Sequence, residues 1–148
     1  MSEVDERLYQ AVEQNDLRAA SKALEDGASA NYIHRESEPS VSTCEAVLYV
    51  ACKMRNKELV ELLLAGGADP NAEYSEAAVW GNASIPCLYE AIPSIEIVRA
   101  LLEKGANPNT LVFPYEHSIP RTALEAASGN QELIDLLKQY GGSLSKEA

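Results

Sequence analysis

Apolar residues recur along this chain at spacings of three and four, which is the period of a helix that buries one face. The pattern is clearest in IEIVRALLEKG, residues 95–105, where Ile97, Val98, Leu101 and Leu102 would share one side of a helix. This stretch ends at a glycine, the residue suited to the left-handed conformation that follows a helix. The pattern therefore predicts an amphipathic helix with a glycine stop.

The same pattern occurs four times, each time with a leucine that is followed three residues later by an alanine. The leading leucines are 40, 40 and 36 residues apart, and the closing glycines are 40, 38 and 36 apart. The leucines are Leu8, Leu48, Leu88 and Leu124, and the glycines are Gly27, Gly67, Gly105 and Gly141. Turn-forming residues and potential N-caps interrupt each unit, at Asn15-Asp16, Arg55-Asn56, Pro93-Ser94 and Ser128-Gly129-Asn130. Each unit is thus predicted to be a helix, a tight turn and a second helix, and four stacked units would share a continuous core.

The segments that follow the second helices are also alike. They read GGADPN at residues 66–71, GANPN at 105–109 and, more loosely, GASAN at 27–31. With the helix pairs, these segments make the chain resemble the ankyrin repeat family. The resemblance implies an all-α repeat solenoid, an ankyrin-type stack of four helix-turn-helix units with long hairpin-like connecting loops. We expect a single domain over residues 1–148, with repeats at approximately 4–31, 45–71, 85–109 and 120–142.

The connections between units are longer than the family requires, because ankyrin units repeat at ~33 residues. From each closing glycine to the next leucine there are 21, 21 and 19 residues, where ordinary spacing would leave about 14. Three enlarged connections result, at residues 32–47, 72–87 and 110–123. Insertions in a stack of repeats project on one face, often the face that binds.

These connections hold five of the nine aromatic residues and both histidines. Because interfaces are enriched in Trp, Tyr and Arg, we predict partner-binding residues there: Trp80, Phe113, Tyr115, Tyr74, Tyr32, His34, Arg35 and His117. Alternatively, the aromatic rings fold back over the helices and anchor the loops, burying ~150 to 250 Å² each. The acidic residues Glu36 and Glu38 are interpreted as a solvated loop tip.

A net charge of −11 narrows the classes of partner. It repels phosphate backbones and so disfavours nucleic acid, and no apolar run approaches the ~18 residues of a membrane span. It could steer the protein towards a basic partner. The acidic N-terminal residues lack the features of a secretory signal, so we expect a cytoplasmic protein that is monomeric by itself.

No catalytic constellation is predicted. His34 and His117 are 83 residues apart, and the three cysteines lack paired C-x-x-C spacing. We therefore expect no enzyme activity, no metal and no cofactor. The favoured function is a non-enzymatic protein–protein interaction module that binds through the aromatic-bearing loops and the concave face. The alternative is an acidic inhibitor or immunity-type protein that neutralises a basic partner such as a nuclease toxin.

Overall fold

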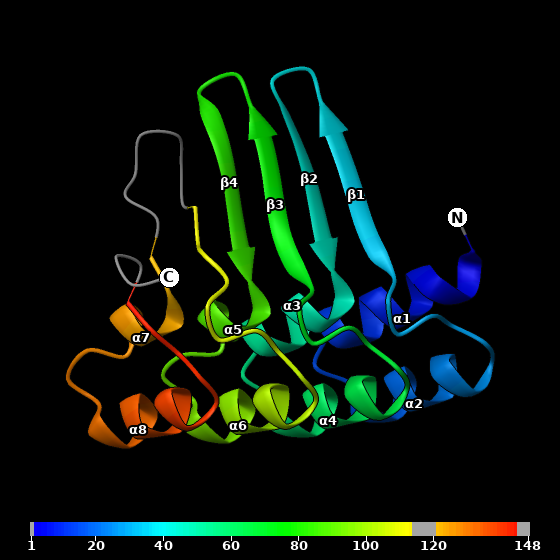
Figure 1. The fold of residues 1–148 in the computed structure, drawn as a ribbon. Coiled ribbons are helices and arrows are strands. Elements are labelled where there is room, and N and C mark those ends of the chain that lie inside the picture. Colours follow the sequence, from blue (N-terminus) through cyan, green and yellow to red (C-terminus); the bar gives the residue numbers. More distant parts are fainter. Residues whose placement is uncertain (1, 114–120, 145–148) are drawn as a thin grey trace.

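The computed structural model describes residues 2–113 and 121–144. Its helices are α1 Glu3–Glu13, α2 Leu17–Glu25, α3 Val47–Lys53, α4 Lys57–Ala65, α5 Cys87–Glu90, α6 Ile95–Glu103, α7 Ala123–Ala126 and α8 Gln131–Gln139. Its strands are β1 Ile33–Glu38, β2 Val41–Ala46, β3 Glu73–Ala78 and β4 Gly81–Pro86. The first helices of the four pairs lie side by side in one row, and the second helices form another row (Figure 1). None of the helices in the described parts of the chain has the length and apolar character needed to span a bilayer.

The repeated leucines and alanines form the centre of the stack. All four leucines are at most 7% exposed and all four alanines at most 4%. Small alanine side chains let neighbouring first helices approach closely, and α3 contacts both α1 and α5. The prediction of four stacked helix pairs is therefore confirmed in the described residues.

The helix ends follow the predicted signals with one exception. Three of the four expected N-cap residues accept a hydrogen bond from the backbone N–H three residues later: Asp16, Asn56 and Asn130. Ser94 occupies the N-cap position of α6, but its side chain makes no such bond. The closing glycines adopt positive φ, for example +103° at Gly27, as a left-handed helix stop requires.

The expectation of an all-α fold is wrong. The connections at 32–47 and 72–87 each form a β-hairpin, and the two hairpins join into one antiparallel sheet with the order β1-β2-β3-β4. Figure 1 shows this sheet rising from the row of first helices, on the side away from the second helices. The hairpins are one repeat apart, so β2 and β3 lie close enough to satisfy each other's backbone groups. What looked like loops in the sequence is therefore a regular extension of the stack.

The third connection is described only at its ends. The backbones of Phe113 and Ser84 exchange two hydrogen bonds, of 2.7 and 2.8 Å, and Val112 pairs with Arg121. The chain around Phe113 thus continues the sheet beside β4. Tyr115 and His117 lie outside the described residues, so their predicted roles stay predictions.

Candidate protein-binding site

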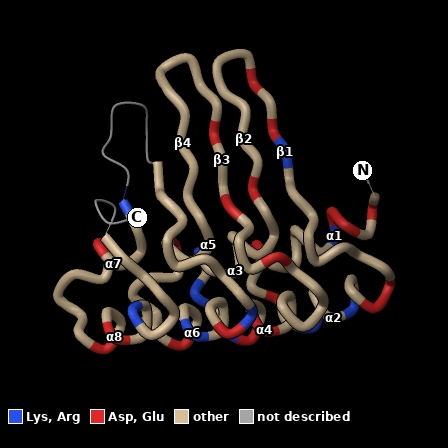
Figure 2. The backbone as a smooth tube through the Cα atoms, in the orientation of Figure 1, with Lys and Arg blue, Asp and Glu red and all other residues tan. Residues whose placement is uncertain are grey.

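Alternate side chains of the four strands lie on one face of the sheet, because successive residues of a strand point to opposite faces. The pairing register arranges this face in three rows. From the helices outward the rows are His34-Glu45-Tyr74-Ile85, Glu36-Thr43-Glu76-Ala83 and Glu38-Val41-Ala78-Gly81. We name it the acidic face, since it carries four glutamates. Figure 2 shows acidic positions along β1, β2 and β3, whereas Arg35 is the one lysine or arginine in the four strands.

The start of β1, which lies nearest the helices, packs against helix α1 through aromatic and polar contacts. The Tyr32 hydroxyl donates to Glu6 Oε2 over 2.8 Å, and His34 Nδ1 lies 3.3 Å from the same oxygen. The imidazole stacks on the ring of Tyr9 at 4.1 Å between centroids, with 11° between the planes. Burial and the hydrogen bond to Glu6 raise the pKa of Tyr32 to about 12. Tyr32 and His34 thus pack on their own helix stack, as the alternative interpretation of the loop aromatics proposed.

His34 also lies between two carboxylates. Its Nε2 is 3.1 Å from Glu36 Oε1, opposite the contact to Glu6. Burial lowers the pKa of His34, but the hydrogen bonds and negative charges of Glu36 and Glu6 outweigh burial and raise it above the usual value of 6.5. When both ring nitrogens carry protons, the imidazolium can donate to both carboxylates at once.

Strands β2 and β3 are held to the first helices in the same way. The Tyr74 ring stacks on Tyr49 of α3 with 5.5 Å between centroids, and its hydroxyl donates to Glu76 Oε2 over 2.6 Å. The Tyr9 hydroxyl donates to Glu45 Oε1 over 2.7 Å. Burial raises the pKa of Tyr9 and Tyr49 above the usual value for tyrosine, which favours the protonated hydroxyl that donates a hydrogen bond. Tyr74, predicted as a binding residue, therefore also anchors its strand.

The two remaining aromatics of the predicted set that the structure describes, Trp80 and Phe113, lie open to solvent. Trp80 is 60% exposed and Phe113 44% exposed, while Val79, which precedes Trp80 in the chain, is 80% exposed. Val79 and Trp80 form the turn between β3 and β4, so the chain turns at these two residues. We name this pair the apolar tip. Large apolar side chains at the end of a hairpin gain nothing from the core, and exposed apolar groups with polar surroundings are typical of interaction sites.

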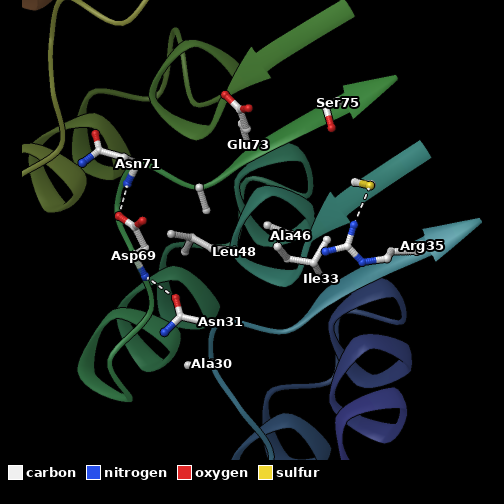
Figure 3. Close-up of a pocket in the computed structure, with 12 residues that line it drawn as sticks. Ala30, Asn31, Ile33, Arg35, Ala46, Leu48, Asp69, Asn71, Glu73 and Ser75 are labelled. Atoms are coloured by element: carbon white, nitrogen blue, oxygen red, sulfur yellow. Dashed lines mark hydrogen bonds between the residues drawn. The ribbon is translucent and has the colours of Figure 1, made fainter. Parts of the chain in front are cut away.

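The opposite face of the sheet forms a groove of about 730 Å³ with the turns of the helix stack (Figure 3). Arg35 lies in this groove, where its Nη1 donates to Cys44 Sγ over 3.1 Å. Asp69 and Asn31 also line the groove, and the Asp69 N–H donates to Asn31 Oδ1 over 2.7 Å. That bond links successive repeats, so it serves the scaffold. The structure therefore separates Arg35 from His34 and Tyr32, although the sequence places all three within four residues.

In residues 2–113 and 121–144, no three His, Cys, Asp or Glu side chains are placed to hold a metal ion. Cys52 and Cys87 are buried, and burial together with the neighbouring Cys52 raises the pKa of the Cys87 thiol. A thiol with a raised pKa carries little thiolate and is a poor nucleophile.

The glutamates of the acidic face were not predicted from the sequence as a site. Glu36 and Glu38, interpreted as a solvated loop tip, lie on strand β1, and Glu45 and Glu76 belong to strands that come from two different repeats. One local signal was present. Tyr32, His34 and Glu36 alternate with other residues in the period of two that a strand produces.

In the described residues, each helix pair packs against the next pair and is closed by a glycine, and such an arrangement is typical of a helical repeat protein. Residues 45–74 match the family model for the ankyrin repeat. The predicted resemblance to the ankyrin repeat family is thereby confirmed. The ankyrin repeat suggests a protein–protein interaction module, and the family is generally non-catalytic.

A likeness to a human protein involves a larger part of the chain. The mitochondrial disaggregase of Homo sapiens is 34% identical over 82 residues, which are 55% of this chain and 11% of the disaggregase. The chain thus matches about a tenth of that longer protein. The likeness extends beyond one repeat but concerns a small region of the relative.

Proposed function

We propose that this chain is a non-enzymatic module that binds a basic protein through its acidic face and apolar tip. One observation carries the proposal: the carboxylates of Glu36 and Glu38 are open to solvent at the end of the sheet that also bears the exposed Trp80. Clustered carboxylates attract a basic surface during encounter, and a desolvated aromatic ring supplies most of the energy in many interfaces. The two features together favour a protein partner over a small ligand.

The residues predicted from the sequence divide between two roles in this proposal. Trp80 and Phe113 contact the partner, because they are exposed and, among the described residues, their rings make no stacking contact of the kind that holds Tyr32 and Tyr74. Tyr32, Tyr74 and His34 hold the strands in position. Arg35 lies on the groove face and is not part of the acidic face. Tyr115 and His117 are proposed to extend the contact from the third connection.

The test compares two double variants after the partner has been captured from cells that make this protein. In Trp80→Ala with Phe113→Ala, we expect the partner to bind more weakly by over ~2 kcal/mol. The control double variant, Leu17→Ala with Met54→Ala, removes apolar side chains of 41% and 40% exposure that lie outside the sheet. Calorimetric titration of the purified partner and thermal unfolding would be measured for both.

The proposal predicts a loss of affinity only in the first double variant, with the midpoint of thermal unfolding retained. If the two double variants bind the partner with the same affinity, the exposed aromatics of the sheet do not contact the partner. If the first variant loses binding only because it unfolds, the two rings are structural.

A second candidate function is an inhibitor or immunity-type protein that covers the basic active site of its partner, such as a nuclease toxin. The acidic face favours it, because its carboxylates can mimic a row of phosphates. We expect the purified partner to lose catalytic activity in proportion to the complex formed. A partner that keeps full activity in the saturated complex would contradict this candidate and leave the binding module standing.

A further inference from the structure

Strand β1 presents a backbone edge that is unpaired within the part of the chain that the structure describes. The Val47 N–H donates to the Tyr32 carbonyl oxygen over 3.0 Å, so residues 32 and 47 form a hydrogen-bonded pair. In an antiparallel ladder, hydrogen-bonded and non-hydrogen-bonded pairs alternate. The N–H and C=O groups of Ile33, Arg35 and Ser37 therefore point away from β2.

This edge has no neighbouring strand in residues 2–113 and 121–144. β1 pairs with β2 alone, and Figure 1 shows it at the outer margin of the sheet. The other margin is different, because Ser84 of β4 already exchanges backbone hydrogen bonds with Phe113. The sheet can thus accept a further strand beside β1, and an extended peptide that adds to a sheet edge gains main-chain hydrogen bonds.

The charges of β1 would select which strand binds. Glu36 and Glu38 are exposed on the acidic face, and Arg35 is exposed on the groove face. Cross-strand neighbours on one face interact favourably when their charges are opposite and unfavourably when they are alike. A neighbouring strand would therefore need lysine or arginine at alternate positions, on the acidic face, with uncharged or acidic residues between them. Charged side chains on an edge strand also disfavour pairing with uncharged strands. The edge of β1 would therefore bind basic strands more tightly than uncharged ones.

We propose that β1 binds an extended segment of the partner that carries lysine or arginine at alternate positions and joins the sheet as an additional strand. This inference rests on the proposed function and deepens it, because it names the part of the basic partner that is recognised. The backbone of Ile33, Arg35 and Ser37 supplies the hydrogen bonds, and Glu36 and Glu38 supply the selectivity.

The experiment uses the full chain and a capped nine-residue peptide of alternating threonine and lysine as the probe. Arg35→Pro removes the outward N–H and places a ring at the edge, whereas Arg35→Ala keeps the N–H and serves as the matched control. Proline is tolerated on an edge strand when its nitrogen faces solvent. We expect Arg35→Pro to weaken peptide binding about tenfold or more, and Arg35→Ala to change it less than about threefold, as the loss of main-chain hydrogen bonds implies.

Amide hydrogen exchange of the unaltered protein gives a second readout that needs no variant. On adding the peptide, exchange should slow at Ile33, Arg35 and Ser37 but change little at His34 and Glu36, whose N–H groups already face β2. A peptide of alternating threonine and glutamate should produce no protection. Should Arg35→Pro fail to fold by circular dichroism, Ser37→Pro is compared with Ser37→Ala in its place.

Three results would overturn the inference. Equal binding by the proline and alanine variants, or protection that does not alternate, would show that the edge is not the site. The third result is slow amide exchange at alternate residues of β1 in the absence of peptide, together with a dimer in analytical sedimentation. It would assign the edge to a second copy of this chain. The proposed function is judged by a different measurement. It stands if the captured partner binds more weakly to the double variant of Trp80 and Phe113, and it fails if that affinity does not change.

Discussion

At the scale of single residues, the aromatics of the long connections divide by what surrounds their rings. His34 is stacked on Tyr9 and bracketed by Glu6 and Glu36, whereas Trp80 is mostly exposed. Composition cannot separate these cases, because Tyr9 and His34 meet through folding and lie 25 positions apart in the sequence. The interpretation that loop aromatics pack on the helices therefore applies to Tyr32 and Tyr74, whereas partner binding by Trp80 and Phe113 stays a proposal.

The environment of His34 makes stability depend on pH. Its pKa is raised in the folded state above the usual 6.5, so the protonated ring stabilises the fold fully below pH ~6.5, and this contribution is lost as pH rises through the raised folded pKa. We expect the free energy of unfolding of the natural protein to exceed that of His34→Gln most at pH ~6, with the difference shrinking towards pH ~9. Urea unfolding at several pH values measures it.

The matched control for this prediction is Glu36→Gln, which removes one of the two charges that raise the pKa of His34. In that variant the pH dependence should be weaker and should shift to lower pH. A difference between natural protein and His34→Gln that is constant, or that grows with pH, would contradict the account of His34.

At the scale of elements, the helices were predictable and the strands were not. Each helix pair carries its own signals, namely the apolar period, the turn residues and the closing glycine, and all of these are local. The strands lack an alternation of apolar and polar residues, because HRESE in β1 and EYSEAA in β3 have few apolar residues and both faces of the sheet are partly open to solvent. Their partners lie in another hairpin, one repeat away. The equal spacing from closing glycine to next leucine across the first two connections, 21 positions in each, was the best available clue.

Helix caps give a direct test at this scale. The Asn130 side chain accepts a hydrogen bond of 3.1 Å from the Leu133 N–H at the start of α8, and Ser94 makes no such bond at the start of α6. We expect Asn130→Ala to lower the free energy of unfolding by about 1 kcal/mol, a typical cost for a lost cap. Ser94→Ala should cost much less. Chemical denaturation of both variants checks this, and equal costs would contradict the assigned caps.

At the scale of the whole molecule, the sheet extends from the row of first helices and carries the acidic face. Each hairpin belongs to one repeat junction, so adjacent repeats place their strands side by side without any additional core. The acidic face therefore depends on the regular spacing of the first two connections. A repeat scaffold of this kind presents a surface larger than any single unit could form.

The central claim is that the acidic face recognises a basic partner, and the association rate with the captured partner tests it most directly. Stopped-flow rates would be measured from low to high salt for Glu36→Gln with Glu38→Gln, and for Glu58→Gln with Glu103→Gln. Both pairs remove two negative charges, but the second pair lies on second helices. We predict a rate that falls steeply with salt and a loss of about tenfold at low salt confined to the first pair. Equal rates for the two pairs, or a rate that does not depend on salt, would contradict the claim.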